Sequence, residues 1–128
     1  MAHADRKNMQ ATIMARMLLV FFRVAHDIYN RQRNPGVVFP EWLVAMAIRV
    51  NDDRGRKPSS LSQIARTTGL PRNTVRRCVG QLIEHGVVKR VGTSYTRDPH
   101  YAARLKQRDV DRLARIVMFT ADVLKQLK

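Results

Sequence analysis

Only one cysteine, Cys78, occurs among the 128 residues, so no disulfide can form within the chain. A chain without disulfides fits a reducing compartment, and we expect a cytoplasmic protein. No secretory signal is visible, and the apolar run from Met17 to Phe22 covers six residues between Arg16 and Arg23. Such a run is far too short to span a bilayer, so the sequence predicts no membrane partner.

The sequence also has few of the patterns that carry catalytic chemistry. Its four histidines, His3, His26, His85 and His100, are scattered and show no metal-ligand spacing. No glycine-rich phosphate loop is present, and nothing arranges serine, histidine and aspartate as a triad. Cys78 falls on an apolar helical face, which favours a small core residue over a redox sensor. We therefore expect no enzyme, no metal and no cofactor.

Acidic residues are scarce, above all between residues 54 and 97. Ten Asp and Glu stand against 24 Lys and Arg, giving a formal net charge of +14. Residues 54–97 hold ten basic residues and one acid, Glu84, whereas residues 1–53 and 98–128 carry only +2 and +3. A charge that served solubility alone would not need to gather in one segment. The distribution indicates a polyanionic partner, which we predict to be a nucleic acid.

The basic segment has a recognisable order of local signals. Residues 60–97 predict two short helices joined by a tight turn and followed by a small β-hairpin. Ser60 stands where a side-chain oxygen caps the first helix, and Gly69 follows that helix where a left-handed residue is needed. Pro71 is suited to open the second helix. The apolar residues of the first helix share one face: Leu61, Ile64 and Ala65.

The second helix, predicted from Pro71 to His85, has two distinct faces. Its apolar stripe consists of Val75, Cys78, Val79 and Leu82. Gly86 ends it, and residues 87–91 and 94–97 alternate as two strands around a Gly92-Thr93 turn. A helix that is apolar on one side and basic on the other, after a tight turn, has the layout of a recognition helix for a DNA major groove.

These residues resemble the winged helix-turn-helix of bacterial transcription regulators. The run GLPRNTVRRCVGQLIEHGVVKR, residues 69–90, is similar to the MarR family, and FPEWLVAMAIRV, residues 39–50, looks like the preceding helix of that family. The resemblance implies a mainly α-helical fold with a β-hairpin wing, a homodimer formed by the terminal helices, and double-stranded DNA as the partner. In some relatives a small effector releases the DNA, and Phe21, Phe22, Trp42 and Phe119 are candidates for such a pocket or for an ordinary core.

The flanking segments predict further helices within a single winged-helix domain, residues 1–128. An N-terminal helix is expected over residues 9–31, with a wide apolar face that serves either a subunit interface or its own subunit. The winged helix-turn-helix core is expected over residues 40–97, beginning with a helix from Pro40 to Asn51. Its predicted buried residues are Trp42, Leu43, Met46 and Val50. Asp98 and Pro99 begin the C-terminal helices, residues 98–128, the last of which is expected over residues 109–127.

The predicted function is sequence-specific binding of double-stranded DNA by a homodimer that regulates transcription in the cytoplasm, at the nucleoid. Two recognition helices would enter successive major grooves, about 34 Å apart. The residues predicted to contact base edges are Arg72, Asn73, Arg76 and Arg77. Those predicted to contact the DNA backbone are Ser60, Ser62, Thr74, Lys89, Arg90, Tyr95 and Arg97.

Alternatives remain open at this stage. Each of these charged side chains can instead be a solvated surface group. Arg54, Arg56 and Lys57 belong to a polar loop that either touches the DNA backbone or is simply solvated. The whole domain can alternatively be a winged helix that binds a protein or RNA, or that serves in replication.

Overall fold

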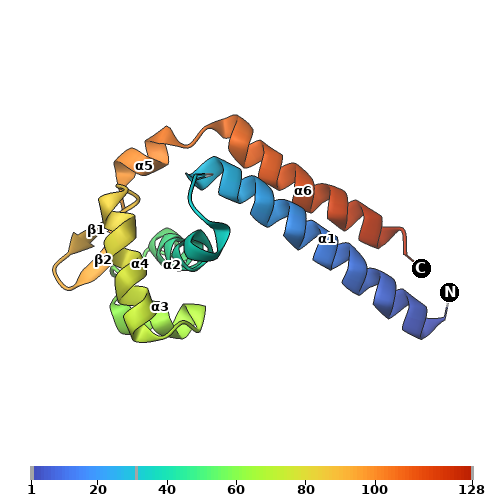
Figure 1. Ribbon diagram of the computed structural model, residues 1–128, viewed down its shortest axis with the longest axis horizontal. Coiled ribbons are helices and arrows are strands. Elements are labelled where there is room, and N and C mark those ends of the chain that lie inside the picture. Colours follow the sequence, from blue (N-terminus) through green and yellow to red (C-terminus); the bar gives the residue numbers. More distant parts are fainter. Residues whose placement is uncertain (1, 31, 128) are drawn as a thin grey trace. The chain divides into compact units, whose positions relative to one another are not determined.

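The structure is a computed structural model that describes residues 2–30 and 32–127. It is mainly helical, with one two-stranded antiparallel hairpin after the helix-turn-helix, as predicted. The elements in chain order are α1 (His3–Asn30), α2 (Pro35–Asp53), α3 (Leu61–Thr68), α4 (Arg72–Glu84), β1 (Val88–Val91), β2 (Ser94–Arg97), α5 (Pro99–Arg104) and α6 (Gln107–Lys125) (Figure 1).

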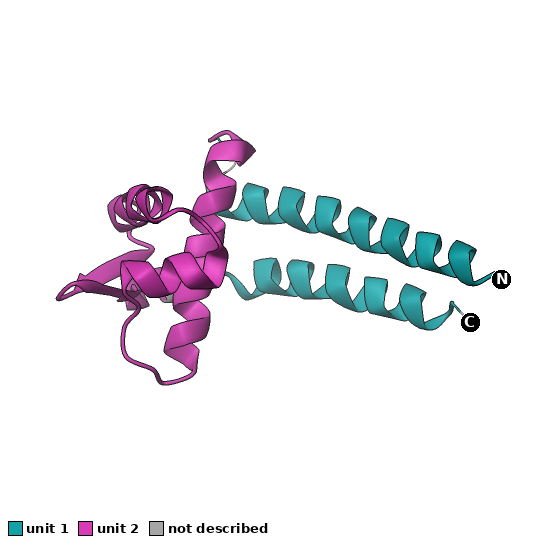
Figure 2. Cartoon of the chain, turned by 90° about the horizontal axis from the view of Figure 1, so that it is seen from below, with its two compact units in different colours: residues 1–32, 106–128 teal, residues 33–105 magenta. Residues whose placement is uncertain are grey.

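The chain folds into two compact units (Figure 2). Unit 1 combines Met1–Gln32 with Lys106–Lys128 and contains α1 and α6, and unit 2 is Arg33–Leu105 and contains the other elements. Whether residues 1–128 behave as the single domain that we expected stays a prediction.

Unit 2 is a winged helix-turn-helix. α2, α3 and α4 enclose its core, and β1 pairs with β2 so that Arg90 faces Tyr95 and Val91 faces Ser94. The fully buried apolar side chains come from α2, α3, α4 and β1: Val38, Val44, Ile48, Ile64, Val75, Cys78, Val79, Leu82 and Val88. The core therefore holds the helix-turn-helix and the base of the hairpin together.

The turns follow the local signals of the sequence. Ser60 and Gln63 form a capping box, in which Gln63 N donates to Ser60 Oγ at 3.2 Å and Ser60 N donates to Gln63 Oε1 at 2.9 Å. Gly69 has a φ of 76° at the end of α3, and Gly92 has a φ of 62° in the hairpin turn. Both conformations strain a residue with a Cβ atom, which explains glycine at these two places.

The prediction for α2 was wrong about the first residue of the helix and about its buried face. The helix begins at Pro35 rather than Pro40, because Asn34 Oδ1 caps it by accepting from Gly36 N at 2.8 Å and Pro35 suits the first turn. Pro40 lies inside the helix. Met46 and Val50 are exposed and Trp42 and Leu43 are half-buried, whereas the buried positions are Val38, Glu41, Val44 and Ile48.

The terminal helices also differ from the expected bounds. α1 begins at His3 instead of Met9, since residues 3–8 contain no helix breaker and Asp5 lies in the first turn, where an acid is favourable. The predicted last residue of this helix, Arg31, lies outside the described residues. α6 covers Gln107–Lys125 where we expected residues 109–127.

Unit 1 is a pair of antiparallel helices with little core of its own. α1 and α6 run side by side, and near their ends Arg6 Nη2 donates to the Leu127 carbonyl oxygen at 3.4 Å (Figure 2). Among the described residues of this unit only Thr120 is buried. Leu19 is 73% exposed and Phe119 is 71% exposed. Unit 1 therefore leaves much apolar surface uncovered.

Candidate nucleic-acid interface

The helix α4 separates its apolar and basic residues as its sequence predicts. Its stripe is buried against the core of unit 2 at Val75, Cys78, Val79 and Leu82. The four residues predicted to read bases are exposed: Arg72, Asn73, Arg76 and Arg77. Arg76 Nη1 donates to Asn73 Oδ1 at 3.1 Å, so these two side chains lie together on the outer face. The α-helical period places the charges outward once the stripe is buried.

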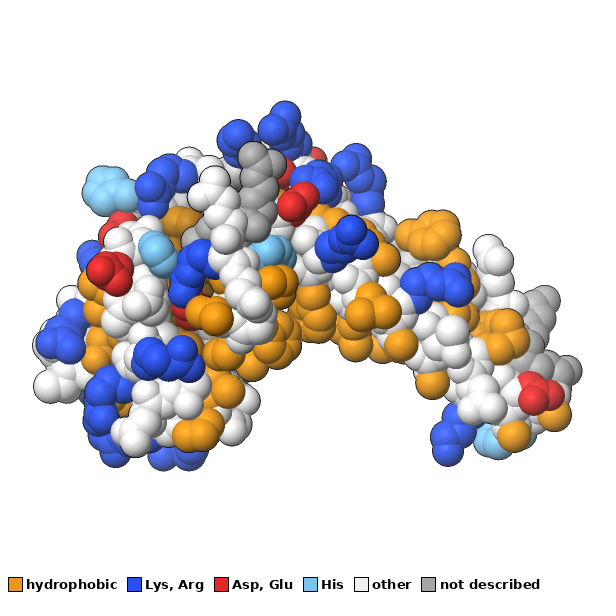
Figure 3. Space-filling model, in the orientation of Figure 1, with side chains coloured by type: hydrophobic (Ala, Val, Ile, Leu, Met, Phe, Trp, Pro, Cys, Tyr) orange, Lys and Arg blue, Asp and Glu red, His pale blue; other side chains and the backbone are white. Residues whose placement is uncertain are grey.

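Residues from three elements line one polar hollow, which we call the first hollow. It has a volume of about 380 Å³ and lies between the start of α3, the start of α4 and the hairpin. Its lining consists of Ser60, Leu61, Ser62, Arg72, Arg76, Arg90, Gly92, Thr93 and Tyr95. Three guanidinium groups thus meet in a hollow whose lining has no carboxylate, which suits an anionic ligand. Figure 3 shows Lys and Arg side chains over this part of unit 2.

Six of the eleven residues predicted to contact DNA line the first hollow. The sequence predicted each of them but not that they lie together. These are Ser60, Ser62, Arg72, Arg76, Arg90 and Tyr95. At the start of α3 the Ser60 hydroxyl oxygen accepts from the backbone in the capping box, and its own proton stays available to a ligand. A helix start of this kind presents unpaired N–H groups and a partial positive charge to a phosphate.

Tyr95 differs from the other residues of the hollow because its side chain is in the core. The residue is only 4% exposed. Its backbone pairs with Ser59 in both directions, with Tyr95 N donating to Ser59 O at 2.8 Å and Ser59 N donating to Tyr95 O at 3.0 Å. The Arg90 guanidinium lies 5.7 Å from the Tyr95 ring centroid, and Arg90 Nη2 donates to the hydroxyl at 3.4 Å. Tyr95 therefore orients Arg90.

Five other predicted residues do not line the first hollow. Asn73 and Arg77 are exposed on α4, Thr74 is half-buried there, and Lys89 is exposed on β1. Arg97 lies at the opposite end of the hairpin, where its Nη1 pairs with Asp53 Oδ1 at 2.9 Å. The ion pair ties the end of β2 to the end of α2. Contacts of all eleven residues with DNA stay predictions.

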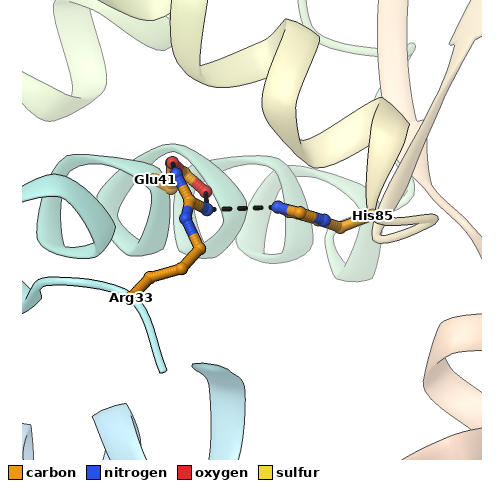
Figure 4. A network of polar contacts seen from close by, with 3 residues as sticks. All are labelled: Arg33, Glu41 and His85. Carbon is orange, nitrogen blue, oxygen red and sulfur yellow. Dashed lines mark hydrogen bonds and ion pairs between the residues drawn. The ribbon is translucent and has the colours of Figure 1, made fainter. Parts of the chain in front are cut away.

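A polar network that sequence reasoning missed supports the other end of α4. Glu41 is 1% exposed on α2 and accepts two hydrogen bonds from Arg33, at 2.9 Å to Oε1 and 2.8 Å to Oε2. Arg33 Nη1 also lies 3.1 Å from Nε2 of His85, the residue that caps the C-terminus of α4 (Figure 4). The available signal was Glu41 itself, the one charge in the apolar run from Pro40 to Ile48.

The thiol of Cys78 is one titratable group of unit 2 whose pKa is shifted by its surroundings. Cys78 is buried, and burial raises the pKa of its thiol, although the neighbouring Arg77 charge acts in the opposite direction. A thiol in this state is a poor nucleophile at neutral pH. Across residues 2–30 and 32–127, no three His, Cys, Asp or Glu side chains are grouped to hold a metal ion. None of the helices described has the length and apolar character needed to cross a membrane.

Comparison with known proteins finds a family model that is similar to this part of the chain. Residues 53–92 match the IclR helix-turn-helix domain, a stretch that starts at the last residue of α2 and ends in the hairpin turn. No curated protein matches the chain significantly. The match does not support the predicted MarR-like subfamily. Together with the winged helix-turn-helix geometry, it supports a DNA-binding transcription regulator.

Proposed function

We propose that the protein binds double-stranded DNA in a sequence-specific manner as a homodimer and regulates transcription in the cytoplasm. The observation that carries this proposal is the first hollow, in which the start of α3, the basic face of α4 and Arg90 of the hairpin converge without an acidic neighbour in the lining. The three elements can thereby hold one DNA backbone while α4 lies in the adjacent major groove.

In this proposal the exposed face of α4 reads the bases. Arg72, Arg76 and Arg77 suit the O6 and N7 acceptors of guanine, and Asn73 suits the N6 and N7 atoms of adenine. The hydrogen bond between Arg76 and Asn73 keeps both side chains on the face that enters the groove. Ser60, Ser62, Thr74 and Arg90 of the hairpin fix the position of the helix through phosphate contacts, which carry no sequence information directly.

The homodimer is supported by the uncovered apolar surface of unit 1. Two antiparallel helices by themselves cannot fully bury the apolar faces of both helices. Two such pairs from two subunits can enclose a common core as a four-helix bundle. A groove of about 590 Å³ between α1 and α6 is lined by apolar side chains with arginines among them. The second copy is the occupant that we propose for this groove, and Figure 3 shows hydrophobic side chains on the surface of these helices.

Three of the aromatic residues that we considered for an effector pocket form ring pairs, and the fourth lines the groove of unit 1. Phe119 lines the groove of unit 1. Phe21 and Phe22 form an edge-to-face pair with ring centroids 6.1 Å apart, and Trp42 forms another with Phe39 at 6.3 Å in unit 2. These pairs support packing roles, and we propose no effector.

Binding to DNA is expected to fall steeply with salt. If each subunit neutralises about four phosphates, the slope of log affinity against log salt for a dimer is about −7. The measurement is a titration of a random-sequence duplex over a salt series, with an RNA of the same sequence as the comparison. A slope near zero, or tighter binding to RNA, would contradict the proposal, and the second result would favour an RNA-binding module.

A further inference from the structure

We infer that the protein has a second phosphate site, on the side of α3 that faces the end of α2. The site is a polar hollow of about 290 Å³, which we call the second hollow. Its polar lining residues are Asn51, Arg56, Ser59, Gln63, Arg66 and Thr67. The ligand that fits this lining is a phosphodiester group of the DNA backbone. The inference rests on the proposed DNA-binding function and extends its footprint beyond α4 and the hairpin.

The side chains of the second hollow are arranged to donate hydrogen bonds. Arg56 from the loop after α2 and Arg66 from the exposed face of α3 both line the hollow. Gln63 Oε1 already accepts from Ser60 N, so the amide nitrogen of Gln63 is left to donate to a ligand. Two guanidinium groups and an amide offer the charge-assisted hydrogen bonds that phosphate oxygens accept.

The loop that carries Arg56 is fastened to α2 nearby. Asn51 Nδ2 donates to the Lys57 carbonyl oxygen at 2.8 Å, which joins the last turns of α2 to the residue after Arg56. Ser59 then forms its two backbone hydrogen bonds with Tyr95. Arg56 lies in the short segment between the end of α2 and the anchored Lys57, so the ordering entropy that a ligand must overcome to use Arg56 is small.

The carboxylates closest in sequence are occupied elsewhere. Asp52 Oδ2 accepts from Thr96 Oγ1 at 2.7 Å and from Arg97 N at 2.8 Å, and Asp53 pairs with Arg97. Neither aspartate lines the second hollow, whose lining carries two positive charges and no negative one. The hairpin thus engages both aspartates at the end of α2, Asp52 through hydrogen bonds and Asp53 through an ion pair.

The two hollows use different residues of α3 and its cap. Ser60, Leu61 and Ser62 line the first hollow, and residues 63, 64, 66 and 67 line the second. The capping box joins them, because Ser60 belongs to one hollow and Gln63 to the other. A duplex held through α3 can therefore place phosphates at two points of the same small helix.

The test is the salt dependence of duplex binding by the Arg56→Ala/Arg66→Ala double variant. Loss of one phosphate contact in each subunit lowers the slope by about 1 per subunit, or about 2 for a dimer. The affinity falls by the same factor for a specific site and for random duplex, because the contact is with the backbone. The matched control is Arg49→Ala, which removes an exposed arginine of α2 that lines neither hollow.

The outcomes separate this inference from the function on which it rests. A double variant with the slope of the wild type, or of the Arg49→Ala control, would overturn the second site and leave DNA binding intact. A wild-type protein that does not bind duplex DNA would overturn both. If the double variant kept the duplex slope but lost thermal protection by inorganic phosphate, the hollow would be a site for a free anion and the inference would be wrong.

Discussion

Arg33→Ala is expected to lower the free energy of unfolding by about 3–5 kcal/mol, the range found when one partner of a buried ion pair is removed. Arg33 donates two hydrogen bonds to the Glu41 carboxylate, and Glu41 is almost completely buried. Removing the guanidinium leaves the carboxylate without this cation in a poorly solvated position. Urea denaturation with linear extrapolation measures the change.

Two further variants identify the cause of that loss. In the Arg33→Ala background, Glu41→Gln is expected to restore part of the stability, since a neutral amide costs less to bury than a carboxylate. Arg54→Ala removes an exposed arginine near the end of α2 and is expected to stay within about 0.5 kcal/mol of the wild type. If Arg33→Ala lost no more than this control, the ion pair would not support the fold as we describe.

The second large effect is expected for Phe119→Glu in the groove between α1 and α6. Phe119 lines this groove and is mostly exposed in the single chain, so a carboxylate there is tolerated by the monomer and excluded from an apolar interface. Sedimentation equilibrium is expected to show a dimer for the wild type and a monomer for the variant. Affinity for a duplex with two half-sites is expected to fall by about 10²–10⁴, the gain that linked binding provides.

The matched control is Phe119→Leu, which keeps an apolar side chain and is expected to stay dimeric. A duplex with one half-site provides a second control, because the monomeric variant keeps the complete DNA-reading unit and is expected to bind it as a single wild-type subunit does. A wild-type protein that sediments as a monomer, or a Phe119→Glu variant that stays dimeric, would show that this groove is not the subunit interface.

The helix-turn-helix could be predicted from the sequence because its determinants are local. Ser60 and Gln63 lie three residues apart in the capping box, Gly69 takes the left-handed conformation within one residue of the helix it ends, and Gly92 does the same in the hairpin. The buried stripe of α4 follows the helical period without interruption. Such signals need no knowledge of distant residues.

The buried face of α2 could not be predicted in the same way. Apolar side chains occur nearly all round this helix, so periodicity alone does not select one face. Contacts with α3, α4 and β2 make the selection, and they bury Val44 and Ile48 while Met46 stays exposed. Glu41 is buried because Arg33 reaches it from outside the helix, a contact that an apolar pattern does not reveal.

The residues of the candidate interface could be predicted from the sequence, but their arrangement in space could not. The composition located the basic segment. Which arginines lie close together depends on how the hairpin packs beside the start of α3. Arg90 reaches the first hollow because Tyr95 lies opposite it in the hairpin register, whereas Arg97, on the same strand as Tyr95, pairs with Asp53. The pairing of strands therefore separates two arginines that looked equivalent in the sequence.

The central claim is that the basic face of α4 reads DNA from a firmly held scaffold. The most direct measurement is the affinity of wild-type protein, Arg76→Ala and Arg77→Ala for a duplex selected from a random pool. Each substitution of a base-reading arginine is expected to weaken specific binding by about 1–3 kcal/mol and to relax the preference at one position of the site. Unchanged affinity and unchanged site preference in both variants would contradict the account.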